Sequence, residues 1–191
     1  MRPIMIAALA VTLSACAAAL PRIVGGERVT QPGVSFVVPA NKPWFMLLRS
    51  TYQIMLGAKG DNQKETLIVG VSTYNIPAFS SPQDFLAHVK SGRAAGPQTG
   101  RFEVVRNEEQ LYTERSETCV KHETESKDFG AKRGGDYSII QYIGMNCIHP
   151  KQPTVGILVE LSREAPPGIE YPQFKPMGSQ LLRSVEFSAY Q

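Results

Sequence analysis

Apolar and polar residues alternate along much of this chain, with the two-residue period of β-strands. The alternation is clear over residues 66–74 and 154–162. A Gly60-Asp61-Asn62 turn separates residues 45–58 from residues 66–74, so these two segments are predicted to form a β-hairpin. In chain order, strands are predicted over residues 34–39, 45–58, 66–74, 101–127, 137–148 and 154–162.

Two segments follow the helical period instead. Ser81 is a suitable N-cap, Pro82 occupies the first helical position, and an apolar stripe follows until Gly92. A second helix is predicted over residues 176–187. Helices set apart from a run of antiparallel strands indicate an α+β domain, here an antiparallel β-sheet with two main helices packed on it.

Three features of this order are an opening strand before Pro43-Trp44, one mid-chain helix at 81–91, and a C-terminal helix near Leu181. The succession is similar to the PsbP-like α/β/α sandwich of photosystem extrinsic proteins and small bacterial lipoproteins. The resemblance covers residues 34–187 as a pattern of elements, and it implies a fold without fixing a function.

The N-terminus carries a different pattern. Residues 4–13 form an uncharged apolar run after Arg2, far shorter than the ~20 residues of a membrane-spanning helix but suited to a signal peptide. The run ends in Leu13-Ser14-Ala15-Cys16, which resembles the lipobox of bacterial lipoprotein signal peptides. The resemblance implies cleavage before Cys16 and lipidation of its sulfur. An ordinary secretory signal and a buried N-terminal helix are the alternatives.

The lipobox resemblance also implies a location and a domain plan. Ala17 follows the cysteine in place of the aspartate linked to inner-membrane retention, so the outer membrane is favoured if the host has two membranes. The predicted plan is a signal peptide at 1–15, a lipidated cysteine and flexible tether at 16–33, and one α+β domain at 34–191. Without residues 1–15, 19 basic and 17 acidic residues remain, too small an excess for nucleic-acid binding.

Cys119 and Cys147 form an even pair in an oxidising compartment. Their midpoint falls in the turn at residues 132–136, so an antiparallel hairpin closed there would place them opposite each other and favour a disulfide. On flat strands Cys119 would share a face with charged Lys121, whereas Cys147 would share one with Ile143 and Met145. Either twist or a bulge mixes these faces, or the register is wrong.

The nearest pattern to a metal site is Cys119-x-x-His122 with Cys147-x-His149, which has the residue types of a zinc site. Strand alternation points Cys119 and His122 to opposite faces, and the disulfide competes for both thiols. We therefore expect no bound metal or other cofactor.

Other candidate residues favour structural roles. His88 with Asp84, and Glu123 with Glu125, lack the nucleophile or cleft that catalysis needs. We interpret the acid-rich stretch 108–128 as a solvated sheet face in preference to an acidic docking surface. Trp44 is predicted to be a core residue.

The chain contains none of the common hydrolase, metalloprotease or nucleotide-binding motifs, so we do not expect an enzyme. The leading hypothesis is a lipid-anchored envelope protein whose domain docks with another, unidentified envelope protein. The alternative is a binding module for a small apolar or lipidic ligand held between sheet and helices.

Overall fold

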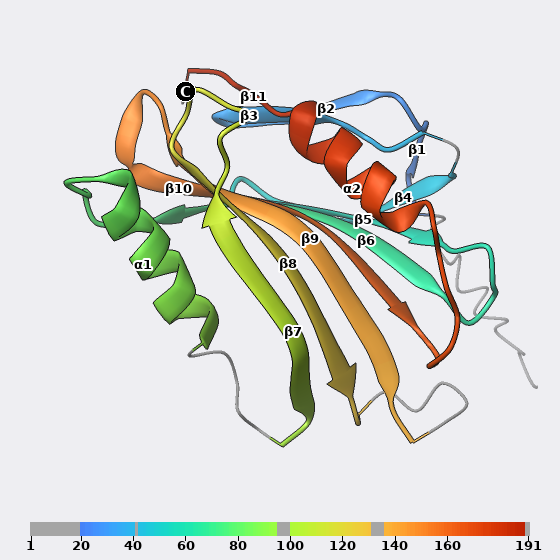
Figure 1. Ribbon diagram of the computed structural model, residues 1–191. Helices are drawn as coiled ribbons and strands as arrows, with labels where there is room; N and C mark the ends of the chain where they lie inside the picture. Colours follow the sequence, from blue (N-terminus) through green and yellow to red (C-terminus); the bar gives the residue numbers. More distant parts are fainter. Residues whose placement is uncertain (1–19, 41, 95–99, 131–135, 190–191) are drawn as a thin grey trace, which may run out of the picture.

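The computed structural model describes residues 20–40, 42–94, 100–130 and 136–189, and a large antiparallel sheet dominates it. The spatial order of its eight strands is β1-β4-β5-β6-β10-β9-β8-β7 (Figure 1). Their bounds are β1 Arg22–Ile23, β4 Trp44–Arg49, β5 Gln53–Lys59, β6 Thr66–Asn75, β7 Phe102–Leu111, β8 Cys119–Asp128, β9 Ser138–His149 and β10 Gln152–Ala165.

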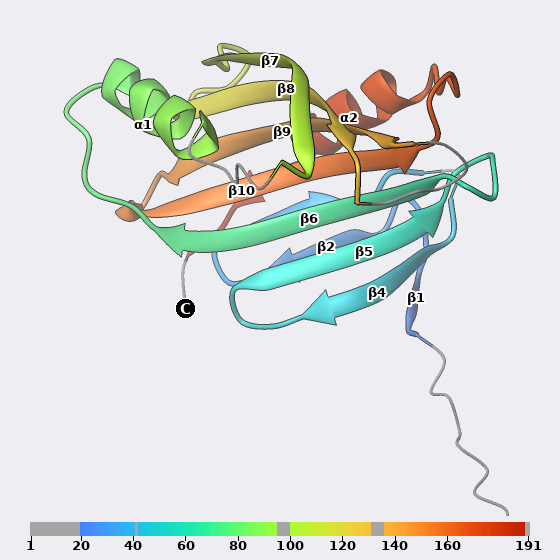
Figure 2. The same cartoon turned by 90° about the horizontal axis from the view of Figure 1, so that it is seen from below.

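A second, three-stranded sheet and two helices lie against the large sheet. The small sheet has the order β11-β3-β2, with β2 at Arg28–Gln31, β3 at Val34–Val37 and β11 at Glu186–Phe187. Helix α2 (Phe174–Arg183) and the small sheet cover one face of the large sheet, and α1 (Pro82–Ala94) lies on the other (Figures 1 and 2). The α+β prediction is confirmed, although strands take 51% and helices 14% of the structure.

The main core fills the space between the large sheet, the small sheet and α2. Inward-pointing residues alternate along β5, β6 and β10, and the apolar side of α2 packs on them. Trp44 is fully buried there and its indole N–H donates to the Pro39 carbonyl at 2.9 Å, so its prediction as a core residue is confirmed. We call the sheet face on this side the α2 face.

The opposite sheet face, the α1 face, is only partly covered. A smaller cluster of Ile76, Phe85, Val89 and Val120 joins α1 to the sheet at one end. The Ser81 hydroxyl accepts the backbone N–H of Asp84 at 3.2 Å, as the predicted N-cap requires. Neither helix in the described part of the chain is long and apolar enough to span a membrane.

Several predicted boundaries differ from the structure. Residues 45–58 are not one strand, because Ser50 accepts the N–H groups of Tyr52 and Gln53 and turns the chain between β4 and β5. Residues 101–127 divide into β7 and β8. The last helix ends at Arg183, and Glu186–Phe187 pair with β3.

The flexible tether predicted for residues 16–33 is wrong for residues 22–31, which contain β1 and β2. Gly26, at φ +88°, turns the chain, and its N–H donates to the Val38 carbonyl at 2.8 Å. Val29 then reaches the core with only 5% exposure. Alternation over residues 28–31 is a strand signal that the neighbouring glycines and prolines obscured. Residues 1–19, with Cys16, lie outside the described residues.

The predicted disulfide is confirmed. Cys119 of β8 lies directly opposite Cys147 of β9, with the sulfurs bonded and the Cα atoms 4.1 Å apart. The β8–β9 register runs without a bulge, so Lys121 does lie opposite Met145. The two faces mix because this side of β8 passes from the core to the rim beside α2, where charged side chains reach solvent.

Candidate functional site

A cleft on the α1 face of the described structure has a volume of about 980 Å³. It is lined by the last turn of α1 and by strands β7 to β10. Figure 2 shows α1 beside these strands. Apolar side chains from β7, β9 and β10 form much of its wall, namely Phe102, Val104, Tyr142 and Leu158. Clefts of this size and character commonly bind small molecules.

Arg93 of α1 fixes the polar part of the cleft. Its guanidinium lies 3.0 Å from the carboxylate of Glu109 and 3.7 Å from that of Glu160, and it donates to the Thr124 hydroxyl at 2.7 Å. The Thr124 hydroxyl in turn donates to the side-chain oxygen of Asn107 at 2.7 Å. This network joins α1 to three strands, so the polar groups are held in place before any ligand binds.

His122 lies beneath this network with 1% exposure. Its Nε2 is 2.9 Å from a carboxylate oxygen of Glu160, and its Nδ1 is 3.5 Å from the amide nitrogen of Asn146. The Tyr74 hydroxyl donates to the side-chain oxygen of Asn146 at 2.8 Å, which leaves the Asn146 amide as a donor to Nδ1. The imidazole is then neutral, with its proton on Nε2 and directed at Glu160.

Burial has consistent electrostatic effects around the cleft. It lowers the pKa of His122, and the bond to Glu160 opposes this shift only in part. It raises the pKa of Tyr74 to about 12 and also raises that of Tyr142. With a neutral His122, two carboxylates face one guanidinium, so the polar part of the cleft favours an uncharged or cationic group over an anion.

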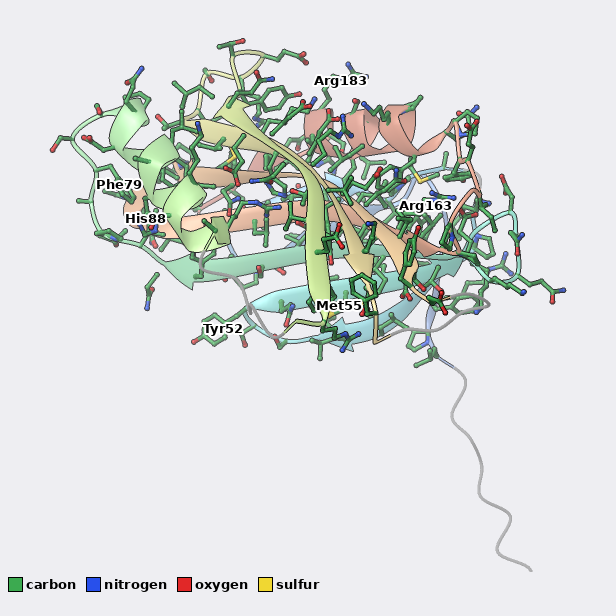
Figure 3. The ribbon with its side chains drawn as sticks, turned by 60° about the horizontal axis from the view of Figure 1, so that its bottom comes forward. Tyr52, Met55, Phe79, His88, Arg163 and Arg183 are labelled. Carbon is green, nitrogen blue, oxygen red and sulfur yellow. A yellow bond between two sulfur atoms is a disulfide. The ribbon has the colours of Figure 1, made fainter. Side chains whose placement is uncertain are left out.

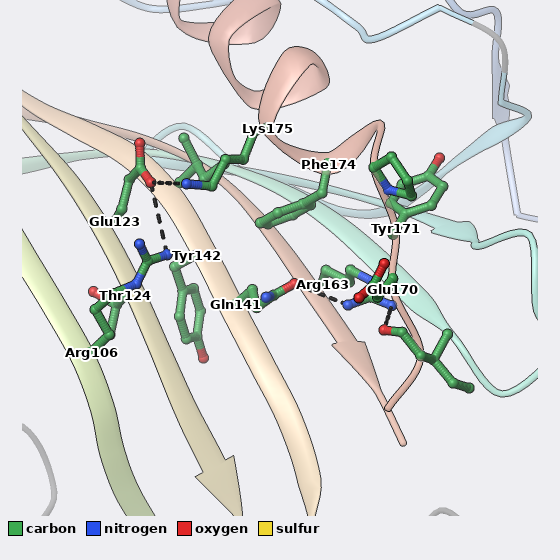
Figure 4. Close-up of a pocket in the computed structure, with 13 residues that line it drawn as sticks. Arg106, Glu123, Thr124, Gln141, Tyr142, Arg163, Glu170, Tyr171, Phe174 and Lys175 are labelled. Atoms are coloured by element: carbon green, nitrogen blue, oxygen red, sulfur yellow. Dashed lines mark hydrogen bonds and ion pairs between the residues drawn. The ribbon is translucent and has the colours of Figure 1, made fainter. Parts of the chain in front are cut away.

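A smaller depression of about 380 Å³ lies near the start of α2 (Figure 4). Glu123 contacts Lys175 at 3.2 Å and Arg106 at 3.9 Å, and Lys121 at 3.1 Å. Burial alone would raise the pKa of Glu123, but Lys121 and Lys175 hold it below its usual value. Glu123 is already bound by three cations, and the depression has less than half the volume of the cleft on the α1 face, so we do not choose it as the ligand site.

The groups of the alternative zinc pattern do not converge. Cys119 and Cys147 are bonded to each other, and His122 points to the α1 face, away from them. His149 is held by the Ser188 carbonyl at 3.0 Å from Nε2 and by the backbone N–H of Lys151 at 3.2 Å from Nδ1. No group of three metal-ligating side chains occurs among the described residues.

The other candidate residues also have structural partners. His88 packs its ring against Phe79, with centroids 5.0 Å apart, on the exposed side of α1 (Figure 3). Glu125 accepts the Gln141 amide at 2.8 Å. Basic side chains neutralise several acidic residues of the 108–128 stretch. Arg115 forms an ion pair with Glu117 at 3.2 Å, and Arg93 forms one with Glu109. A free acidic docking surface therefore loses support.

Sequence reasoning did not identify Arg93, Glu160 and Val104 as members of one site. Glu160 did give a signal, because it is a carboxylate between Val159 and Leu161 in an apolar part of strand β10. What the sequence lacked was the position of α1, whose last turn brings Arg93 over that carboxylate. No protein-family model matches the chain, and a comparison with curated proteins gives no match.

Proposed function

We propose that this protein is a lipid-anchored component of the bacterial envelope that binds a small amphiphilic ligand in the α1 cleft. The lipobox at residues 13–16 supports the anchor and an outer-membrane location in a host with two membranes. The layers α1, large sheet, and α2 with the small sheet support a PsbP-like sandwich as the domain.

The observation that carries the ligand proposal is the composition of the cleft. Apolar walls offer a surface for the apolar part of a ligand, and Asn107, Thr124 and the Arg93 network supply fixed hydrogen-bonding groups. The ligand class is thus an apolar body with an uncharged or cationic polar group. The local excess of carboxylate over guanidinium disfavours an anionic head.

The same geometry supports binding without catalysis. His122 is the best candidate for a catalytic base among the residues of this network. Its side chain has no exposed surface, however, and its two ring nitrogens face Glu160 and Asn146. A general base must reach a proton on the substrate. In this arrangement His122 orients Glu160 and does not meet a ligand.

The test uses two fluorophores with the same rings, neutral N-phenylnaphthylamine and anionic anilinonaphthalenesulfonate. We expect saturable enhancement of N-phenylnaphthylamine fluorescence by the mature protein and weaker binding of the sulfonate. Val104→Asp places a charge on the cleft wall and should abolish binding. The matched control is Val105→Asp, at an exposed valine next to it in β7 that does not line the cleft. Equal loss in both variants would contradict the proposed site.

Docking with another envelope protein is the second candidate function. It is favoured by β7, a ten-residue strand at the end of the sheet order, whose outer edge is free to pair within the described structure. A photo-crosslinker at Val105 tests it in native membranes. Labelling of one specific envelope protein would support docking, and labelling of none would exclude this edge as the interface.

A further inference from the structure

Strand β4 exposes three large apolar side chains on the side of the sheet opposite β7. Phe45, Leu47 and Leu48 are 37%, 45% and 41% exposed. A bulge at Leu47 lets all three lie on the α1 face, because Phe45 pairs with Gly57, Leu48 pairs with Met55, and Leu47 lies over Gly57. We call these three residues the β4 strip. An exposed apolar cluster of this kind marks an interaction surface.

The glycine at position 57 makes room for this arrangement. A Cβ atom added there would stand 2.7 Å from Cδ1 of Leu47, so the glycine gives the bulged leucine room to lie flat on the sheet. Figure 3 shows Met55 and Tyr52 on the same strand pair, with Tyr52 projecting from its turn. Tyr52 is 65% exposed and extends the apolar surface at that end.

The N-terminal end of the described chain is fixed to this same edge. Arg22 of β1 pairs with Phe45, and the N–H of Met46 donates to the Pro21 carbonyl at 2.8 Å. Figure 2 shows β1 beside β4, on the side of the sheet away from β7. Any lipid attached upstream is therefore joined to the molecule next to the β4 strip.

The distance between Cys16 and β1 is short. Cys16 stands six residues before Arg22, and a fully extended chain spans at most ~3.6 Å per residue, or about 22 Å in total. The free edge of β7 lies six strand spacings from β4, up to about 29 Å across the sheet. A lipid on Cys16 thus holds the β4 edge, and not the β7 edge, close to the bilayer.

The charges around the β4 strip fit an anionic lipid surface. Lys59 of β5 is an exposed cation on the same sheet face as Gly57, whereas Lys42 is ion-paired with Asp61 and Arg49 donates to the Thr30 carbonyl. Arg22, on the paired strand, adds a further exposed cation on the side of Phe45. Apolar side chains flanked by cations are the composition of surfaces that enter the headgroup region of anionic membranes.

We propose that the β4 strip is a membrane-contacting surface, which inserts into the headgroup region and fixes the orientation of the domain. This inference rests on the lipid anchor of the proposed function. The orientation places the β4 edge against the bilayer, with β7 and the α1 cleft toward the aqueous side.

The test is a spin-label depth measurement on the full mature protein in vesicles of phosphatidylethanolamine and phosphatidylglycerol. The label is placed at Leu47→Cys, and the matched control at Val105→Cys, since both residues are exposed and occupy bulges in edge strands. With Cys16 lipidated and Cys119 bonded to Cys147, the new thiol is the only one free to react. If Leu47→Cys fails to fold, Leu48→Cys replaces it.

We expect the ratio of oxygen to nickel-chelate accessibility at position 47 to rise several-fold on reconstitution, while position 105 stays accessible to the chelate. The intact mass of each sample shows whether the lipid is attached, so a failure of the lipid anchor can be distinguished from a failure of the membrane contact. A lipidated protein whose two labels are equally accessible to water would overturn the membrane contact and leave the anchor standing. A protein without lipid would overturn both.

Discussion

The imidazole of His122 crosses an entire strand to reach Glu160, with 2.9 Å between Nε2 and the carboxylate oxygen. His122 is on β8 and Glu160 on β10, and the residue between them on β9 is Gly144. A Cβ atom at Gly144 would stand 2.5 Å from Nε2 of His122 and 2.8 Å from the Val159 carbonyl oxygen. The buried network under the cleft therefore depends on a glycine at this position.

Gly144→Ala should lower the free energy of unfolding by about 1–3 kcal/mol, because the methyl group overpacks the site and displaces the imidazole. Urea unfolding measures this loss. The matched control is Gly70→Ala, in β6 on the same sheet face, where an added Cβ meets nothing within 4 Å. Equal effects of the two substitutions would contradict the crossing contact.

His122 should make the stability of the domain depend on pH. Burial lowers its pKa in the folded state below the ordinary value near 6.5, so the unfolded chain binds a proton that the folded chain does not. The free energy of unfolding is then highest above pH ~6.5 and falls as the pH drops toward the lowered pKa, with a slope of at most about 1.4 kcal/mol per pH unit.

His122→Gln should remove this slope, and comparing urea unfolding of the two proteins at several pH values isolates the contribution. His88→Gln is the control, because it changes an exposed imidazole on α1 that packs on Phe79. An unchanged slope in His122→Gln would show that another group carries the pH dependence.

The Cys119–Cys147 bond should contribute about 3–4 kcal/mol to stability, since it closes a loop with a sequence separation of 28 in the unfolded chain. The double variant Cys119→Ala/Cys147→Ala should lose about this amount in urea unfolding. Chemical reduction of the unchanged protein provides the comparison. If neither treatment alters the midpoint, the bond does not constrain the unfolded state as expected.

The buried pair of Arg163 and Glu65 should be sensitive to loss of either partner. Their side chains are 3% and 1% exposed, and Arg163 also donates to Gln141 at 2.9 Å and to the Ile169 carbonyl at 2.6 Å (Figure 4). Arg163→Met leaves the Glu65 carboxylate buried without its cation and should cost about 3–5 kcal/mol.

The contrasting change is Lys127→Met, which removes an ion pair with Glu103 at the surface. Exposed pairs contribute about 0–1 kcal/mol, so this variant should unfold at nearly the same urea concentration as the parent. Similar losses in the two variants would contradict the distinction between the buried and the exposed pair.

The sequence predicted the features that depend on local hydrophobic periodicity, or on the position of two residues about a turn. The α1 N-cap at Ser81, the pairing of Cys119 with Cys147, and the β6 and β10 strands all follow from nearby residues. It failed where a short strand is held by distant partners, as at residues 28–31, whose alternation was masked by Gly25-Gly26 and Pro32. The final turn of the last predicted helix failed for the same reason, since Glu186 pairs with β3 and with Arg28.

The candidate site was harder to predict than the fold. Arg93, Glu109, Glu160 and His122 come from four elements, and only the tertiary structure brings them together. The sequence shows that Glu160 stands between Val159 and Leu161, but it does not show that α1 covers one end of that sheet face and leaves a cleft beside it.

The most direct test of the ligand proposal is the amide NMR spectrum of the mature protein during titration with N-phenylnaphthylamine. We predict saturable shifts confined to the cleft, including Asn107, Ser126 and Leu158. Shifts confined to Phe45, Leu47 and Leu48, or no saturable shifts at all, would contradict a ligand site beneath α1.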